Sequence, residues 1–311
     1  MTTDDLLKET FSYKSYGRHE TFHLRTGWLR KGFEKIKNDP NFFNDEFAIE
    51  EFGVGKNMIN AIRYWCQAFD VITSSKNGYV QTPFGEMIFK EDKYLEDPFS
   101  DWLLHYTLAT NFQLAPTFFW AFNYLGLKEF NADNFIRSLN ALHTRLGVKE
   151  VREASILSDF HIFIQTYCDR SNEKKASDDI LDSPFSNLEL VMPSQDKRNY
   201  RFKIGPKRDL PAELIAYAIV KQMQYRLKSS EPLSNFQINL EALLWEPFSP
   251  GMVFKLDGES LISSLDKICQ DRILGNAHFS TSAGIKQLIV TCKKLEPINV
   301  VNKFYEKAIT K

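Results

Sequence analysis

Apolar and polar positions alternate with a helical period over residues 56–72, and the neighbouring segments are organised around this stretch. Five apolar side chains recur at helical spacing on one face of it: Met58, Ile62, Trp65, Cys66 and Phe69. Such a stripe is typical of a helix that buries one side. A shorter apolar segment, residues 43–52, precedes it and ends at Gly53 and Gly55. The pattern predicts two helices joined by a tight, glycine-bearing turn.

A hairpin pattern follows the second helix. Asn77 and Gly78 stand between two short runs that favour strands, which predicts a two-residue primed turn with Lys76 at its tip. Thr82 and Pro83 then cap and start another helix. Helix, turn, helix and hairpin together make the plan of a winged helix-turn-helix.

The face of residues 56–72 opposite the apolar stripe carries donor-rich polar side chains and no carboxylate. Its members are Lys56, Asn57, Asn60, Arg63, Tyr64 and Gln67. Arginine, lysine, asparagine and glutamine suit the edges of guanine and adenine in the major groove, and Lys76 would meet a phosphate. We therefore predict that this face and the hairpin tip bind DNA. Because a fold alone does not determine its use, a protein-contact module is the alternative.

A basic stretch precedes the winged unit. Residues 14–37 hold seven basic and two acidic side chains, and their apolar positions predict an amphipathic helix that packs on the winged unit. Arg18 and Arg25 are candidate phosphate contacts on its basic face, although a solvated face explains the same pattern. Residues 1–12 are expected to be frayed.

Helical patterns fill the middle of the chain. The segments expected to be helical are residues 100–111, 116–125, 132–146 and 151–168. Aromatic side chains crowd the first two, and at helical spacing they indicate core rather than a platform for stacking bases. Residues 169–183 are polar and form the best candidate linker.

Beyond the linker, residues 200–204 alternate as a half-buried strand does. Arg201 and Lys203 belong to a run of basic residues there and are candidate phosphate contacts, although basic side chains also protect edge strands. Helices are expected at residues 211–227, 236–245 and 258–268, with a hairpin within 273–290. This order allows a second, degenerate winged unit without the donor-rich face, better suited to a protein-contact or dimer surface.

The expected fold class is therefore mainly α with small β-hairpins. An N-terminal winged helix-turn-helix would be followed by a helical bundle, with a second winged-helix-like unit as an option at the C-terminus. The corresponding domains are residues 1–97, 98–170 and 184–311.

Composition narrows the choice of function only slightly. The chain has 311 residues, of which 43% are hydrophobic and 25% charged, and its net charge is −1. These values are typical of a folded protein with ample core and argue against a uniformly basic DNA-coating protein. The four cysteines are far apart, which excludes a CxxC site or a zinc ribbon. With no long apolar run and no signal-like N-terminus, a cytoplasmic protein without a membrane partner is expected.

Two groups of residues have the spacing of metal ligands. His19 and His23 would share a helix face, but flanking arginines oppose a cation. Asp178, Asp179 and Asp182 could hold Mg²⁺, as a nuclease would need, although solvated charge in a linker explains them as well. No phosphate-binding loop and no GxSxG motif is present. The residues alone do not require an enzyme, and no cofactor is assigned beyond Mg²⁺ in the event of nicking.

Three passages, residues 18–30, 52–65 and 249–257, resemble a prokaryotic family of formerly unknown function encoded beside DNA-phosphorothioation genes. That family includes the SspB component of the single-strand phosphorothioation system, which is regarded as a DNA-nicking protein. The resemblance covers nearly the whole chain. It implies DNA binding in a modification and anti-phage system, with a cysteine desulfurase, a sulfurtransferase and an ATPase as protein partners. It assigns no catalytic residue in this sequence.

Three hypotheses follow. In the first, the protein is a DNA-binding component that brings or prepares DNA for sulfur insertion. In the second, it also nicks one strand with a bound metal. In the third, it is a winged-helix transcriptional regulator that reads a palindrome as a homodimer, or a non-catalytic docking subunit of the same gene cluster.

Overall fold

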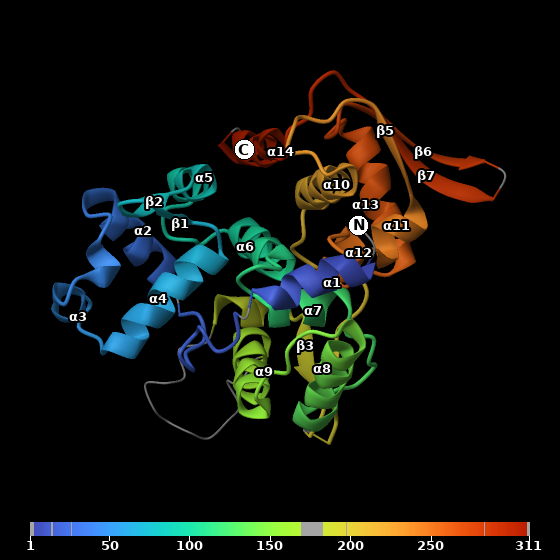
Figure 1. The fold of residues 1–311 in the computed structure, drawn as a ribbon. Helices are drawn as coiled ribbons and strands as arrows, with labels where there is room; N and C mark the ends of the chain where they lie inside the picture. Colours follow the sequence, from blue (N-terminus) through green and yellow to red (C-terminus); the bar gives the residue numbers. More distant parts are fainter. Residues whose placement is uncertain are drawn as a thin grey trace. The chain divides into compact units, whose positions relative to one another are not determined.

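The computed structural model describes residues 3–13, 15–25, 27–168, 183–196, 198–282 and 284–309. The chain divides into two compact units, Met1–Lys203 and Ile204–Lys311, and each is described by itself (Figure 1). The predicted linker around Asp178 lies outside the described residues. The division into three domains stays a prediction.

The first unit begins with short helices and one hairpin. In chain order these are α1 (Thr3–Ser12), α2 (Trp28–Asn38), η1 (Phe42–Asn44), α3 (Phe47–Phe52), α4 (Lys56–Ala68), β1 (Ile72–Ser75), β2 (Gly78–Gln81) and α5 (Pro83–Glu91). Strands β1 and β2 pair antiparallel, with Ser75 opposite Gly78. Helix α4 packs on α2. As predicted, Thr82 caps α5, because its hydroxyl accepts from the Gly85 backbone N–H at 2.9 Å.

The remainder of this unit is a helical bundle with a phenylalanine-rich core. Its elements are α6 (Pro98–Thr110), α7 (Pro116–Asn123), α8 (Ala132–Leu146), α9 (Glu153–Tyr167), η2 (Pro184–Leu188), β3 (Val191–Pro193) and β4 (Tyr200–Phe202). Phe118, Phe122 and Phe163 are almost fully buried. The ring of Phe163 lies 5.7 Å from the rings of both Phe118 and Phe122. The aromatic clusters are therefore core, as the helical spacing predicted.

The second unit consists of helices and one three-stranded sheet. Its elements are α10 (Ala212–Leu227), β5 (Phe236–Asn239), α11 (Leu240–Trp245), α12 (Pro250–Phe254), α13 (Gly258–Gln270), β6 (Asn276–Ser282), β7 (Ile285–Thr291) and α14 (Pro297–Ile309). The sheet is antiparallel in the order β5-β7-β6. Helix α10 packs on α14, and α13 packs on β6.

The expected class, mainly α with small antiparallel hairpins, is confirmed. Two local expectations are wrong. Within the segment expected to be frayed, residues 3–12 form α1, in which Leu6, Leu7 and Phe11 are buried. The helix expected at residues 236–245 is strand β5 followed by the short α11. The amphipathic helix expected within the basic stretch is α2, which begins at Trp28 and packs on α4.

None of the helices in the described part of the chain is long and apolar enough to cross a membrane.

A buried carboxyl group marks the start of α6. Asp101 is half-buried as a whole, but one of its oxygens, Oδ1, is buried and has no hydrogen-bond partner within the described residues. Burial, with smaller contributions from Asp92 and Asp97, raises the pKa of Asp101 to about 7. Asp92 is itself held by the Ser100 hydroxyl, which donates to it at 2.7 Å.

We predict that Asp101→Asn removes a pH dependence of stability. Since the folded pKa is raised, the folded chain keeps a proton that the unfolded chain has lost between about pH 4 and pH 7. The free energy of unfolding of the unaltered protein should therefore fall, by on the order of 2 kcal/mol, as pH rises through this window. Urea unfolding at pH 5 and pH 8 measures the difference. An equal drop in the Asn variant would contradict the assignment to Asp101.

Candidate nucleic-acid interface

Helix α4 is positioned by its apolar face. Ile62, Trp65 and Cys66 are fully buried. Gly32 of α2 allows the two helices to approach, because a β-carbon at this position would lie 2.5 Å from the Cys66 Sγ. The preceding helix α3 ends at Gly53, whose φ of 64° supplies the left-handed cap of the predicted tight turn.

The opposite side of α4 carries the predicted polar face. Lys56 and Asn57 are exposed, and Asn60, Arg63 and Gln67 are half-buried. Arg63 Nη2 donates to Asn60 Oδ1 at 3.1 Å. Gln67 Nε2 donates to the Ser74 hydroxyl of β1 at 3.0 Å. These contacts hold the polar side chains in place along the helix and tie the helix to the hairpin.

Arg18 lies at the same surface, although it comes from a loop far outside α4. A cavity of about 370 Å³ is lined by Arg18, Glu20, Asn60, Arg63, Tyr64, Gln67, Ser74, Tyr79 and Leu114. The lining of this cavity thus includes two arginines and two carboxamides but a single acid, Glu20. No local sequence pattern indicates that Glu20, Tyr79 or Leu114 lines this cavity, because their proximity depends on tertiary packing.

The hairpin extends this surface. Lys76 lines a neighbouring recess of about 660 Å³ that shares Ser74 and Tyr79 with the first cavity. The turn lies one residue earlier than expected and is not of the primed type. Lys76 and Asn77 form it, neither has a positive φ, and Gly78 follows with φ 116°. A side chain at Gly78 would overlap the carbonyl oxygen of Pro40, so the turn is seated against that residue.

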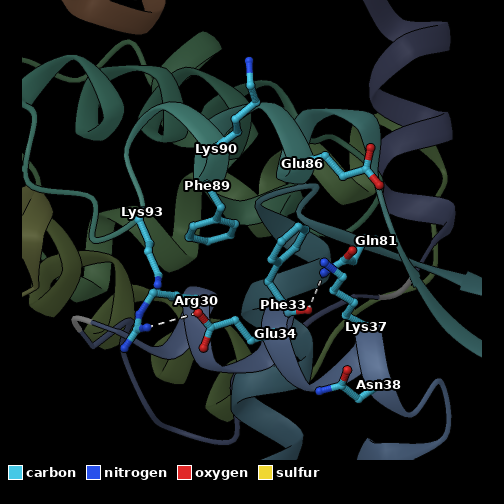
Figure 2. Close-up of a pocket in the computed structure, with 10 residues that line it drawn as sticks. All are labelled: Arg30, Phe33, Glu34, Lys37, Asn38, Gln81, Glu86, Phe89, Lys90 and Lys93. Carbon is cyan, nitrogen blue, oxygen red and sulfur yellow. Dashed lines mark hydrogen bonds and ion pairs between the residues drawn. The ribbon is translucent and has the colours of Figure 1, made fainter.

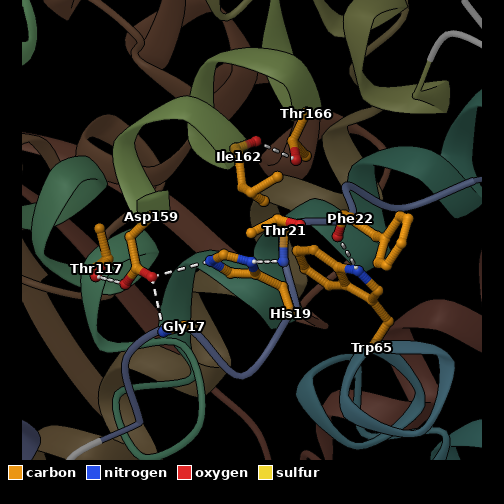
Figure 3. A network of polar contacts seen from close by, with 9 residues as sticks. All are labelled: Gly17, His19, Thr21, Phe22, Trp65, Thr117, Asp159, Ile162 and Thr166. Atoms are coloured by element: carbon orange, nitrogen blue, oxygen red, sulfur yellow. Dashed lines mark hydrogen bonds and ion pairs between the residues drawn. The ribbon is translucent and has the colours of Figure 1, made fainter. Parts of the chain in front are cut away.

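The loop that carries Arg18 is anchored by a buried carboxylate. Asp159 of α9 is 4% exposed. Its Oδ1 accepts from the Gly17 backbone N–H at 2.8 Å and from His19 Nε2 at 2.9 Å. Its Oδ2 accepts from the Thr117 hydroxyl of α7 at 2.5 Å. Figure 3 shows these donors converging on one side chain, so the two residues flanking Arg18 are fixed to the bundle.

The tautomer of His19 follows from its contacts. The Thr21 backbone N–H donates to His19 Nδ1 at 3.1 Å, so this nitrogen is the acceptor and Nε2 carries the proton given to Asp159. Thr21 has φ 65°, which is rare for a β-branched residue. His19 therefore has a structural contact rather than the metal site considered from its spacing with His23.

A second anchor joins this loop to α4. Trp65 Nε1 donates to the backbone carbonyl of Phe22 at 3.0 Å, as Figure 3 shows. The segment around Arg18 is therefore attached to α9 at one end and to α4 at the other. This double attachment explains why Arg18 shares a cavity with Arg63.

Tyr64 differs from the expectation of an exposed contact. Its side chain is 6% exposed, and its ring lies 5.0 Å from that of Trp65 and 6.3 Å from that of His19. Burial, and to a smaller extent Asp159, raises the pKa of Tyr64 far above its usual range, while Arg18 lowers it. Tyr64 thus forms part of the cavity wall as a neutral side chain, and it does not extend into solvent.

The remaining candidates lie elsewhere in the first unit. Arg25 stacks over the Trp28 ring at 5.5 Å. Arg201 is exposed on β4, and Lys203 just beyond it forms an ion pair with Glu189. Strand β4 is attached to the bundle, where the Phe202 ring lies 5.2 Å from that of Phe130. Neither cavity beside α4 is lined by Arg25, Arg201 or Lys203.

No metal site can be assigned from the residues that the structure describes. Within those residues, no group of three or more histidine, cysteine, aspartate or glutamate side chains is placed to hold a metal ion. Asp178, Asp179 and Asp182, the candidates from the sequence, lie outside the described residues.

The chain is similar to known proteins over most of its length. A family model described as "Protein of unknown function (DUF4007)" matches residues 16–305. No curated protein matches. A crystal structure of magnesium-ion-bound SspB is similar with a TM-score of 0.83, and one of SspB with a TM-score of 0.80. Each is 25% identical and covers 96% of this chain and 89% of its own.

We predict that Asp159→Ala strongly destabilises the protein, because it leaves the donors of Gly17, His19 and Thr117 buried without an acceptor. The free energy of unfolding should fall by about 3–5 kcal/mol. Asp159→Asn keeps one acceptor oxygen and should cost less, about 1–2 kcal/mol. Urea unfolding followed by circular dichroism measures both values.

A matched control is Glu150→Ala, which removes an exposed carboxylate and should change stability by less than about 0.5 kcal/mol. If Asp159→Ala were as stable as this control, the buried carboxylate would not be the anchor of the loop.

Proposed function

The chain belongs to the DUF4007 family, and because it also shares its fold with SspB, we propose that it is a DNA-binding component of a DNA-phosphorothioation system. It would bring or prepare DNA for insertion of sulfur into the backbone, in a modification and anti-phage role. The observation that carries the proposal is the surface beside α4, where Arg18 and Arg63 meet Asn60 and Gln67 around one cavity.

The order of elements supports a winged helix-turn-helix as the DNA-binding unit. Helices α3 and α4 with the hairpin β1–β2 correspond to the helix-turn-helix and its wing, and α4 would be the helix that enters the major groove. Lys56 and Asn57 are exposed at the start of α4, where recognition helices contact base edges. Lys76 at the turn of the hairpin would contact a phosphate.

Arg25, Arg201 and Lys203 have a weaker basis in this proposal. They line neither cavity, and Lys203 is already paired with Glu189. If they contact DNA, they do so as flanking phosphate contacts that carry no sequence information.

The protein partners we propose are the other components of such a system: a cysteine desulfurase, a sulfurtransferase and an ATPase. In the second unit, the exposed positions of α13 include Glu259 and Asp266, whose charges oppose contact with phosphates. This helix is therefore better suited to a protein partner or a second copy of the chain than to DNA.

Strand nicking is a separate hypothesis that follows from the family resemblance. It has no ligand set among the described side chains, so we assign no catalytic residue.

The DNA-binding proposal predicts that Arg18→Ala/Arg63→Ala weakens duplex binding by about tenfold or more. A guanidinium that contacts a base contributes about 1–3 kcal/mol, and the loss of one that contacts a phosphate reduces the salt slope by about one. Fluorescence anisotropy with duplex DNA across a range of salt concentrations measures both effects.

Lys128→Ala is the matched control, because it removes an exposed cation on the α7–α8 connection, outside both cavities. Thermal melts verify that every variant is folded. Equal affinity of the double variant and the control at all salt concentrations would remove the α4 face from the interface. The same samples, incubated with supercoiled plasmid and Mg²⁺, report whether open circles form.

A further inference from the structure

A second cavity lies between α2 and α5 and shares no lining residue with the surface beside α4. Its volume is about 590 Å³, within the range of pockets for small molecules. Figure 2 shows that its side chains come from α2 on one wall and from β2, α5 and the residues just after α5 on the other. The DNA-binding proposal leaves this cavity without a role.

The centre of the cavity is aromatic. Phe33 of α2 and Phe89 of α5 both point into it in Figure 2, with ring centroids 4.7 Å apart and an interplanar angle of 38°. Each ring is less than one-tenth exposed. The two rings offer an apolar, polarisable surface to a planar group.

One end of the cavity is cationic. The Arg30 guanidinium lies 4.9 Å and the Lys93 ammonium 5.5 Å from the ring of Tyr94, so both cations meet at one aromatic side chain. Arg30 is partly neutralised by Glu34 at 3.1 Å. Lys93 has no carboxylate partner within the described residues, so its charge is available to an anion.

The opposite end is lined by the carboxamides of Gln81 and Asn38, together with Lys37 and Glu86. Gln81 Nε2 donates to the Phe33 carbonyl at 2.8 Å, which fixes the side chain while its Oε1 stays available as an acceptor. Asn38 and Glu86 lie at the same end in Figure 2. An amide and a carboxylate can receive hydrogen bonds from the amino group of a base.

We propose that this cavity binds a nucleoside phosphate. The phosphate would lie at the end formed by Arg30 and Lys93, the base would lie against Phe33 and Phe89, and the amide end would contact the edge of the base. A simple anion would not need the aromatic centre, and an apolar ligand would not need the cations. The same chemistry is offered by a free nucleotide and by the phosphorylated end of a single strand.

The test is isothermal titration calorimetry of the full chain with AMP, adenosine and inorganic phosphate at fixed ionic strength. AMP is expected to bind more tightly than either fragment. Arg30→Ala/Lys93→Ala should weaken AMP binding by about tenfold, since each lost charge-assisted contact removes a substantial share of the affinity. Lys31→Ala/Lys128→Ala is the matched control, because it removes two exposed lysines that do not line the cavity.

A second variant, Phe89→Leu, keeps an apolar side chain but removes the ring. This variant should weaken the binding of AMP and leave the binding of phosphate unchanged. A thermal melt verifies that the variant is folded. The proposal is overturned if AMP shows no saturable binding, if phosphate alone binds as tightly as AMP, or if both double variants bind AMP equally.

A 5′-phosphorylated single-stranded tetranucleotide distinguishes the two sources of the ligand. If Arg30→Ala/Lys93→Ala weakens the binding of both AMP and the tetranucleotide, the site takes a strand end; if it weakens the binding of AMP alone, the site takes a free nucleotide. Arg18→Ala/Arg63→Ala should leave AMP binding unchanged, so failure of this proposal and failure of duplex binding at α4 are separable.

Discussion

A buried carboxylate must be stabilised by hydrogen bonds, and for Asp159 those donors come from two segments that are far apart in the sequence. Its partners Gly17 and His19 belong to the N-terminal loop, and Thr117 belongs to α7. Since each donor would be costly to leave unpaired, the loop has one stable position on the bundle. The location of Arg18 beside α4 depends on this constraint.

Helix α2 links the two surfaces to which we assign functions. Its Gly32 contacts α4, and the adjacent Phe33 faces Phe89 of α5. Successive residues on a helix point about 100° apart, so a single helix can support the back of α4 and form one wall of the cavity between α2 and α5. A residue without a β-carbon is required at the first position, and the second contributes a ring that lines the cavity. The N-terminal part of the chain thus has two distinct faces on one scaffold.

Elements with a strong local pattern were predictable. Helix α8 has the bounds that the sequence predicts. The apolar stripe of α4 correctly predicted that Ile62, Trp65 and Cys66 are buried, and Thr82 caps α5 as expected. The resemblance to the family that includes SspB is confirmed. Tertiary contacts were not predictable: the His19–Asp159 pair spans 140 residues, and the burial of Tyr64 depends on the loop that covers it. Whether the polar face binds DNA stays a prediction.

The close approach of Gly32 to Cys66 makes that thiol a natural reporter of motion in the N-terminal helices. Cys66 is fully buried, and burial raises its pKa well above the usual range. A thiol reagent can react with it only after α2 has moved away from α4. The rate of labelling at this position therefore measures the free energy of that local opening, separately from unfolding of the whole chain. A ligand that holds α2 and α4 together would slow the labelling, so binding becomes detectable at a site that the ligand does not touch.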